Sequence, residues 1–269
     1  MFGFSKGRLP VDSQELEWLM ASAKWLIEAL PGASQMWTRP LILPTTDFFP
    51  DTRLKGHARA QELFDLIRRH TDMADWECVL KAGQAPRPTN LGSGLTHSFE
   101  SNSAAGTFQQ AIDPATGRVI ALIHYDPRLI DDPPSLVATF AHELAHAQLH
   151  TISDEPPGGP ELEELVTDAT AVFMGFGVFL ANSAKSFSAF QSFDSSGWES
   201  RRQGYLSEQM LVTALALSEL LAGRDPMAAH RWLKPYLADD LKQASAYFAK
   251  RHPDVRRDVM QIDLADYGI

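Results

Sequence analysis

Two histidines and a glutamate in the segment His142-Glu143-Leu144-Ala145-His146 have the types and spacing of a metal-binding helix. Residues four apart lie on the same face of an α-helix, so the two imidazoles can bind one Zn²⁺ ion. Glu143 lies beside them and can reach a water molecule on that ion. Because zinc acidifies its water, the carboxylate can accept a proton as the water attacks a carbonyl group. The segment therefore predicts a metal-assisted hydrolytic site.

A catalytic zinc site usually has three protein ligands and an open position, so a third ligand has to come from elsewhere in the chain. In the segment 161–173 the apolar residues share one face of a helix, and Glu164 and Asp168 lie together on the other side. We expect Glu164 to bind the metal. Asp168 can accept the remaining N–H of a metal-bound histidine and so fix its tautomer. Glu161 lies near the same face and is the alternative to Glu164 as ligand.

Each of these residues also has a structural interpretation. The His142–His146 pair with Glu143 could be a buried polar cluster or part of a surface helix. Glu164 could stabilise the start of a helix by its charge, because acidic residues are favourable in the first turn. Asp168 could be a polar residue satisfied against the core. His150 lies two turns from His142, so it cannot easily bind the same ion. We expect its imidazole to interact with the helix dipole instead.

The helix that carries the two histidines has an apolar face and a polar face. The first contains Leu136, Val137, Phe140, Ala141 and Leu144, and the second contains Thr139, His142, Glu143, His146 and His150. It has no Lys or Arg between Ser135 and His150, so the polar face is expected to line a cleft rather than open solvent. Asp131 or Asp132 can cap the helix, and Pro133 suits its first turn.

The remaining pattern predicts an α+β protein. Apolar periodicity and breakers predict helices at 12–30, 56–70, 161–181, 207–222, 226–237 and 239–250. A short strand is expected at 76–80, a strand or extended segment at 39–44, a loop at 83–106, and a β-hairpin from Gly106 to Tyr125 around a turn at Asp113–Gly117. We expect one domain, 1–269, with a mixed α/β N-terminal lobe at 1–130 and a helical lobe at 131–269. A small antiparallel sheet should pack on the helix that carries the active-site motif.

The motif pair resembles the gluzincin metallopeptidases, among them the thermolysin-like enzymes. Their pattern is HExxH followed on a later helix by ExxxD, which matches His142–His146 and Glu164–Asp168. The resemblance implies a zincin-like fold, a bound Zn²⁺ and a substrate-lining edge strand, for which Val119–Tyr125 is placed. It covers about 40 residues and indicates no particular family beyond a general bacterial metallopeptidase character. The longer metzincin motif is excluded by Leu149 and Ile152, where a glycine and a third histidine are required.

Gluzincins often use a tyrosine or histidine to stabilise the oxyanion. No motif identifies that residue here; Tyr205, His230, Arg201 and Arg202 are open alternatives.

Composition restricts the partners of the chain. The net charge of −10 over 269 residues gives no general attraction to nucleic acid or anionic membrane, so neither is expected as a partner. Cys78 is the only cysteine, and no secretory signal is evident. The longest apolar stretch, Ala169–Ala181, is too short to span a bilayer. We therefore expect a cytoplasmic protein. Nothing in the sequence indicates the oligomeric state.

The sequence thus predicts a zinc metallopeptidase that hydrolyses a peptide or protein substrate, with Glu143 as general base. The alternative is a catalytically silent zincin-fold protein that binds or regulates a protein partner. A DNA-associated protease that controls a repressor is a third hypothesis, but no helix-turn-helix or basic stripe supports it.

Overall fold

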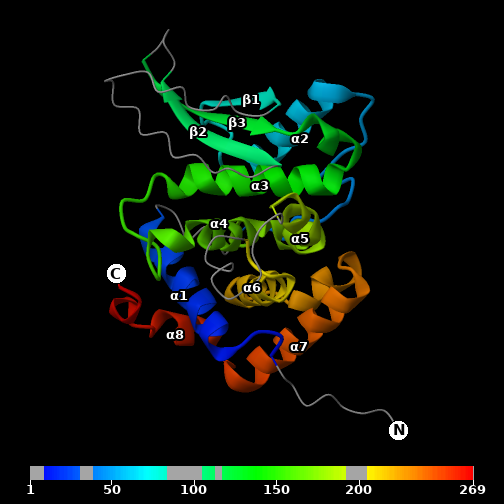
Figure 1. Cartoon of the computed structure of the whole chain (residues 1–269). Helices are drawn as coiled ribbons and strands as arrows, with labels where there is room; N and C mark the ends of the chain where they lie inside the picture. Colours follow the sequence, from blue (N-terminus) through cyan, green and yellow to red (C-terminus); the bar gives the residue numbers. More distant parts are fainter. Residues whose placement is uncertain (1–8, 31–38, 84–104, 113–116, 192–204, 269) are drawn as a thin grey trace.

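The protein is α+β, as predicted, with a three-stranded sheet on one side and helices making up most of the rest (Figure 1). The computed structural model describes residues 9–30, 39–83, 105–112, 117–191 and 205–268, and the side chains of 185–191 are not described. The strands are β1 (Cys78–Ala82), β2 (Gly106–Ile112) and β3 (Val119–Tyr125). The helices are α1 (Ser13–Ala29), α2 (Gly56–His70), α3 (Pro133–Leu149), α4 (Glu163–Ala171), α5 (Gly177–Gln191), α6 (Glu208–Leu221), α7 (Pro235–Arg251) and α8 (Val255–Met260).

The sheet is mixed, so the prediction of an antiparallel sheet is wrong for one of its three strands. Its order is β1-β3-β2. The hairpin strands β2 and β3 are antiparallel, with Gly106 opposite Tyr125. β1 runs parallel to β3, with Cys78 opposite Ala121. A short turn enforces antiparallel pairing only within the hairpin, whereas β1 reaches the sheet through a long connection that permits a parallel strand.

The strand at the edge of the sheet near α3 is β2, not β3. Val119–Tyr125 was expected to be the edge strand, but it pairs with β1 on one side and β2 on the other. That position explains why the inner residues Ile123 and Tyr125 are fully buried. The apolar character of this strand therefore marks the centre of the sheet rather than its edge.

Helix α3 lies under the sheet and forms the centre of the protein (Figure 1). The Asp132 side chain accepts a hydrogen bond from the backbone N–H of Ser135 at 3.4 Å, and Pro133 occupies the first turn. Nearly every residue of α3 is buried, because the sheet covers one side and α4 and α5 pack against the other. The polar face of the predicted helix therefore lies inside the protein.

The helix predicted at 161–181 is not continuous: it bends at Gly175, where the Gly175 and Gly177 pair indicates close helix packing or a bend. After α4 the chain makes a π-helical turn, Val172–Phe176, in which Gly175 has φ of 102°, and α5 then begins at Gly177. A residue with a side chain is strained at that φ, and a Cβ on Gly175 would lie 2.5 Å from the Pro40 carbonyl oxygen. The Gly175 carbonyl accepts a hydrogen bond from the N–H of Ile42 at 2.9 Å, and the segment 39–44 is not part of a strand.

The C-terminal part differs from the prediction at one helix boundary. Instead of a helix at 226–237, a 3₁₀ turn spans Pro226–Trp232 and α7 begins at Pro235. Pro235 suits the first position of a helix but cannot continue one from before it, because it lacks the N–H that the helix requires. α8 was not predicted.

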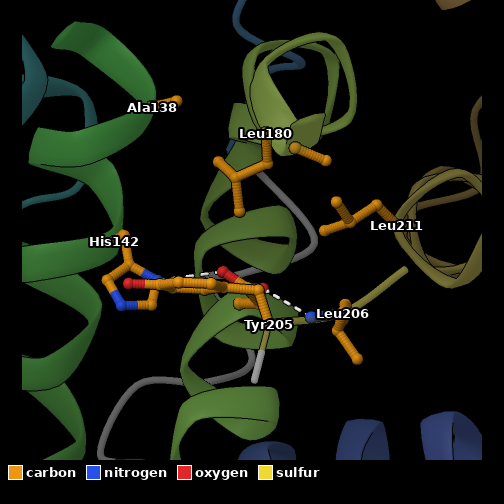
Figure 2. Close-up of a pocket in the computed structure, with 8 residues that line it drawn as sticks. Ala138, His142, Leu180, Tyr205, Leu206 and Leu211 are labelled. Carbon is orange, nitrogen blue, oxygen red and sulfur yellow. Dashed lines mark hydrogen bonds and ion pairs between the residues drawn. The ribbon is translucent and has the colours of Figure 1, made fainter. Parts of the chain in front are cut away.

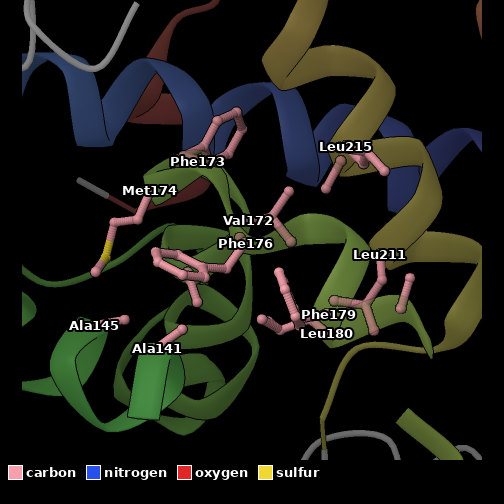
Figure 3. Close-up of a cluster of buried hydrophobic side chains, with 14 of the residues drawn as sticks. Ala141, Ala145, Val172, Phe173, Met174, Phe176, Phe179, Leu180, Leu211 and Leu215 are labelled. Atoms are coloured by element: carbon pink, nitrogen blue, oxygen red, sulfur yellow. The ribbon is translucent and has the colours of Figure 1, made fainter. Parts of the chain in front are cut away.

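Helices from both halves of the chain build the layer below α3. α1 packs against α4, α6 and α8, and its Trp18 indole N–H donates to the Pro157 carbonyl at 2.8 Å. Side chains from α3, the π-helical turn, α5 and α6 interlock in the core between these layers (Figure 3). The run Pro160–Ala184 is long and apolar enough to cross a membrane, but its most apolar part is 89% buried inside the protein, as is usual for a core helix of a soluble protein.

Candidate metal centre

Helices α3 and α4 bring two imidazoles and one carboxylate to a single point. His142 Nε2 and His146 Nε2 are 3.1 Å apart, and Glu164 Oε2 lies 3.3 Å from the first and 3.6 Å from the second. Ligand atoms about 2.0–2.1 Å from one tetrahedral zinc ion lie roughly 3.3 Å from one another. The three observed separations bracket that value, so the group could hold a metal ion.

Hydrogen bonds on the far side of each ring orient the two histidines. His142 Nδ1 donates to Asp168 Oδ1 at 2.9 Å. His146 Nδ1 donates to the hydroxyl oxygen of Thr167 at 3.3 Å, and that hydroxyl donates in turn to the Glu163 carbonyl at 2.8 Å. Partners of this kind fix the tautomer of a metal-bound histidine and leave its other nitrogen free to bind.

The resulting arrangement requires a cation or a proton between the rings. With both Nδ1 atoms protonated, the neutral rings direct two Nε2 lone pairs at each other across 3.1 Å, next to a carboxylate. Glu164 Oε2 is buried and makes no hydrogen bond of good geometry among the described residues. An unpaired buried oxygen is costly, and a shared cation would satisfy all three atoms together.

The pKa values of His142, His146 and Glu164 are shifted by burial and by the contacts of these groups with one another. Burial lowers the pKa of His142, but the hydrogen bonds and charges of Asp168 and Glu164 outweigh it and raise that pKa well above its ordinary value. Burial and the neighbouring His142 charge lower the pKa of His146. Burial raises the pKa of Glu164, but its contacts with the two histidines outweigh burial and lower it. The charged form is thus favoured at His142 and disfavoured at His146 in the metal-free protein.

Asp168 is held from two directions. Its Oδ1 accepts from His142, and its Oδ2 accepts the backbone N–H of Leu206 at 2.8 Å (Figure 2). The chain just before α6 is thereby attached to the metal-binding group. The adjoining Tyr205 ring lies against the His142 ring, with centroids 5.0 Å apart. Tyr205 and Leu206 close a small cavity beside the His142–Asp168 pair (Figure 2).

Glu143 is fully buried beside the group, on the side that faces the sheet. Burial raises its pKa to about 8; the charge of Glu164 adds to this rise, while His142 and the backbone N–H of Phe108 oppose it. Neither carboxylate oxygen has a hydrogen-bond partner of good geometry among the described residues. A buried carboxyl group with a pKa near neutrality is typical of a proton-transfer site.

The close approach of β2 to Glu143 depends on Gly106. A Cβ at this position would lie 2.8 Å from Glu143 Oε1 and 2.7 Å from Thr139 Cγ2. Glycine lets the backbone pass directly over the carboxylate. Two residues further on, the Phe108 ring lies parallel to the His146 ring, with centroids 6.5 Å apart.

The other candidate residues lie elsewhere. Glu161 is exposed in a 3₁₀ turn with its carboxylate beside Gly159, and it is not part of the metal-ligating group. His150 caps the end of α3 and contacts Phe108. His230 lies in the 3₁₀ turn that packs on α6 and α7. Arg201 and Arg202 lie outside the described residues.

The sequence pattern did not reveal two of the groups that hold the site. Thr167 follows the same helical face as Glu164 and Asp168, so its spacing was the available signal, but a hydroxyl in a helix usually bonds only to its own backbone. The N–H of Leu206 carries no sequence signal, because every residue except proline has one.

Comparison of the chain with protein-family models, with curated proteins and with solved structures finds no match. The resemblance to gluzincins therefore rests on the two sequence motifs, and the structure adds only that His142, His146 and Glu164 form a group that could hold a metal ion.

Proposed function

We propose that the chain is a zinc-dependent metallopeptidase. The single observation that carries the proposal is the convergence of His142 Nε2, His146 Nε2 and Glu164 Oε2 at separations of 3.1–3.6 Å. Two imidazoles and one carboxylate on facing helices form the ligand set that catalytic zinc sites commonly use, and it leaves a fourth position open. The Glu164 side chain is 33% exposed, although its Oε2 atom is buried between the two imidazoles.

The donor set also argues for zinc over other ions. Magnesium and calcium prefer six or more oxygen ligands, whereas this group offers two nitrogens and one oxygen. When bound, a Zn²⁺ ion would polarise a carbonyl group and acidify a water molecule.

The residues of the chain have distinct parts in the proposed reaction. His142, His146 and Glu164 hold the ion, and Asp168 and Thr167 keep the two imidazoles turned toward it. Glu143 takes a proton from the attacking water and passes it to the leaving amine. Burial raises the pKa of this carboxyl group in the metal-free protein, and a dication bound beside it would favour the carboxylate form that accepts the proton.

Strand β2 borders the candidate site. It crosses Glu143 at Gly106, and it places the Phe108 ring parallel to the His146 ring. A substrate carbonyl polarised by the ion would have to lie near these two groups.

The conservative variant Glu143→Gln tests the proposal. The amide fills the same volume but cannot accept a proton as a carboxylate does, so zinc should remain bound while peptide hydrolysis falls at least about a hundredfold. Zinc content is measured by elemental analysis and cleavage with a library of quenched fluorescent peptides. Full activity in this variant would end the proposal; zinc binding with no cleavage by the wild type would favour the catalytically silent binding protein.

A further inference from the structure

Three polar side chains form a row across the face of the sheet that lies away from α3. Lys81 on β1 and Thr107 on β2 are both paired with His124 on the central strand β3. Because neighbouring strands are about 4.8 Å apart and paired residues share a face, the three side chains are adjacent. Phe108, the next residue on β2, has its ring parallel to that of His146 on α3, so Lys81, His124 and Thr107, here called the polar row, lie on the opposite face.

Two members of the polar row are buried at atoms that make no hydrogen bond. His124 is 5% exposed, and its Nδ1 atom is without a hydrogen-bond partner within the described chain. The hydroxyl oxygen of Thr107 is also buried and has no partner there. A buried polar atom without a partner costs free energy, so two such atoms on adjacent strands indicate a position for a polar ligand.

The polar row carries a positive charge that no described acid neutralises. Lys81 is exposed and forms no ion pair with another described residue, so the row is open to solvent at its β1 end. Burial lowers the pKa of His124, the charge of Lys81 lowers it further, and no described carboxylate raises it. This local excess of positive charge, in a chain with a net charge of −10, favours a negatively charged ligand and disfavours a metal ion.

Each member of the polar row can donate a hydrogen bond to an oxygen atom. The Lys81 ammonium group has three N–H donors, the neutral imidazole of His124 has one, and the Thr107 hydroxyl has one. Hydrogen bonds to an ionised acceptor are stronger than those between neutral groups. Carboxylate and phosphate groups present several acceptor oxygens to such donors and also balance the charge of Lys81.

We propose that the polar row binds an oxyanion, namely the carboxylate or phosphate group of a small ligand. Lys81 neutralises the charge of this group, while His124 and Thr107 donate hydrogen bonds to its oxygens. The site is separate from the metal centre, because the polar row and α3 are on opposite sides of the sheet (Figure 1). It does not depend on the proposed peptidase activity.

The experiment titrates the metal-free full chain with inorganic phosphate and, separately, with hexanoate, at constant ionic strength. Removing metal with a chelator beforehand prevents either anion from binding to an ion at His142 and His146. Binding is followed by the NMR signals of the His124 imidazole. We expect at least one anion to bind saturably and to shift these signals, and the tighter of the two identifies the ligand as a phosphate or a carboxylate.

Variants of the polar row test each contact. Thr107→Val keeps the shape of the side chain but removes the hydroxyl, so affinity should fall about tenfold, whereas Thr107→Ser should retain it. Lys81→Gln should weaken binding by about tenfold or more. Lys242→Gln is the matched control, because it removes the same charge from an exposed position on α7 and should leave affinity unchanged. Thermal unfolding of every variant identifies any loss of folding.

Three results would overturn the proposal. The first is an absence of saturable binding for both anions in the wild type. The second is binding that Lys81→Gln weakens no more than Lys242→Gln does, which would show an adventitious ion attracted by general charge only. The third is unchanged affinity in a folded Thr107→Val variant, because the hydroxyl would then not contact the anion.

Discussion

Replacement of Asp168 by asparagine tests how much of the metal affinity comes from the orientation of His142. Asp168 accepts two N–H groups, from His142 at 2.9 Å and from Leu206 at 2.8 Å. Asparagine keeps the shape of the side chain but offers one carbonyl oxygen, so one of the two donors then faces an amide NH₂ group. Either His142 turns away from the ion or the Leu206 N–H loses its partner.

The expected loss follows from these contacts. Removing the hydrogen-bond partner of a metal-bound histidine typically reduces metal affinity 10- to 100-fold, which corresponds to about 1.4–2.7 kcal/mol. Losing a hydrogen bond to a buried charged group also lowers the free energy of unfolding by about 1.5–3 kcal/mol. We therefore expect weaker zinc binding and a less stable metal-free protein.

The assay is a titration of metal-free protein with zinc in the presence of a competing chelator, together with chemical unfolding of the metal-free form. Glu163→Gln is the matched control, because Glu163 Oε1 lies 3.9 Å from His146 Nδ1, which is too far for a hydrogen bond. This control should keep wild-type affinity. Equal zinc affinity in Asp168→Asn and the wild type would show that the hydrogen bond to His142 does not support the site.

Three further changes follow from the same structure. Gly175→Ala places a Cβ at a positive φ and 2.5 Å from the Pro40 carbonyl oxygen. It should lower the free energy of unfolding by at least about 2 kcal/mol, measured by thermal unfolding, and an unchanged melting temperature would contradict this. Gly106→Ala pushes against the Glu143 carboxylate, so hydrolysis should fall about tenfold or more while zinc stays bound; undiminished cleavage would refute the close contact. The pKa of His142 is raised in the metal-free protein, so zinc must displace a proton when it binds. The affinity for zinc should therefore increase about tenfold per pH unit until the pH reaches that pKa. A zinc affinity that does not change between roughly pH 5.5 and pH 7 would contradict this prediction.

Local sequence signals predicted most of the elements that position the site. α2 has the predicted bounds, Gly56–His70, because its apolar stripe is regular and the chain around it breaks the pattern. Asp132 and Pro133 marked the start of α3 through their side-chain chemistry. The parallel pairing of β1 was not predictable in this way, because it joins residues about 40 positions apart and leaves no local signature.

The convergence of the three candidate ligands was predictable for a geometric reason. Helical spacing places His142 beside His146 and Glu164 beside Asp168, and a single contact between the two helices then brings the sets together. The Gly175 and Gly177 pair indicates close helix packing or a bend, and the structure has a bend at Gly175. The contact that excludes a side chain there comes from the Pro40 carbonyl, which is remote in the sequence and leaves no local signal. Groups supplied by the tertiary fold, such as the Leu206 N–H, require the structure.

Metal content by elemental analysis tests the central claim most directly, namely that His142, His146 and Glu164 bind one ion together. The wild type should carry one zinc per chain, and His146→Ala and Glu164→Ala should lose it. The neighbouring variants His150→Ala and Glu161→Ala should retain it, because neither residue belongs to the metal-binding group. Full zinc content in Glu164→Ala, or its loss in Glu161→Ala instead, would contradict the assignment of the ligands.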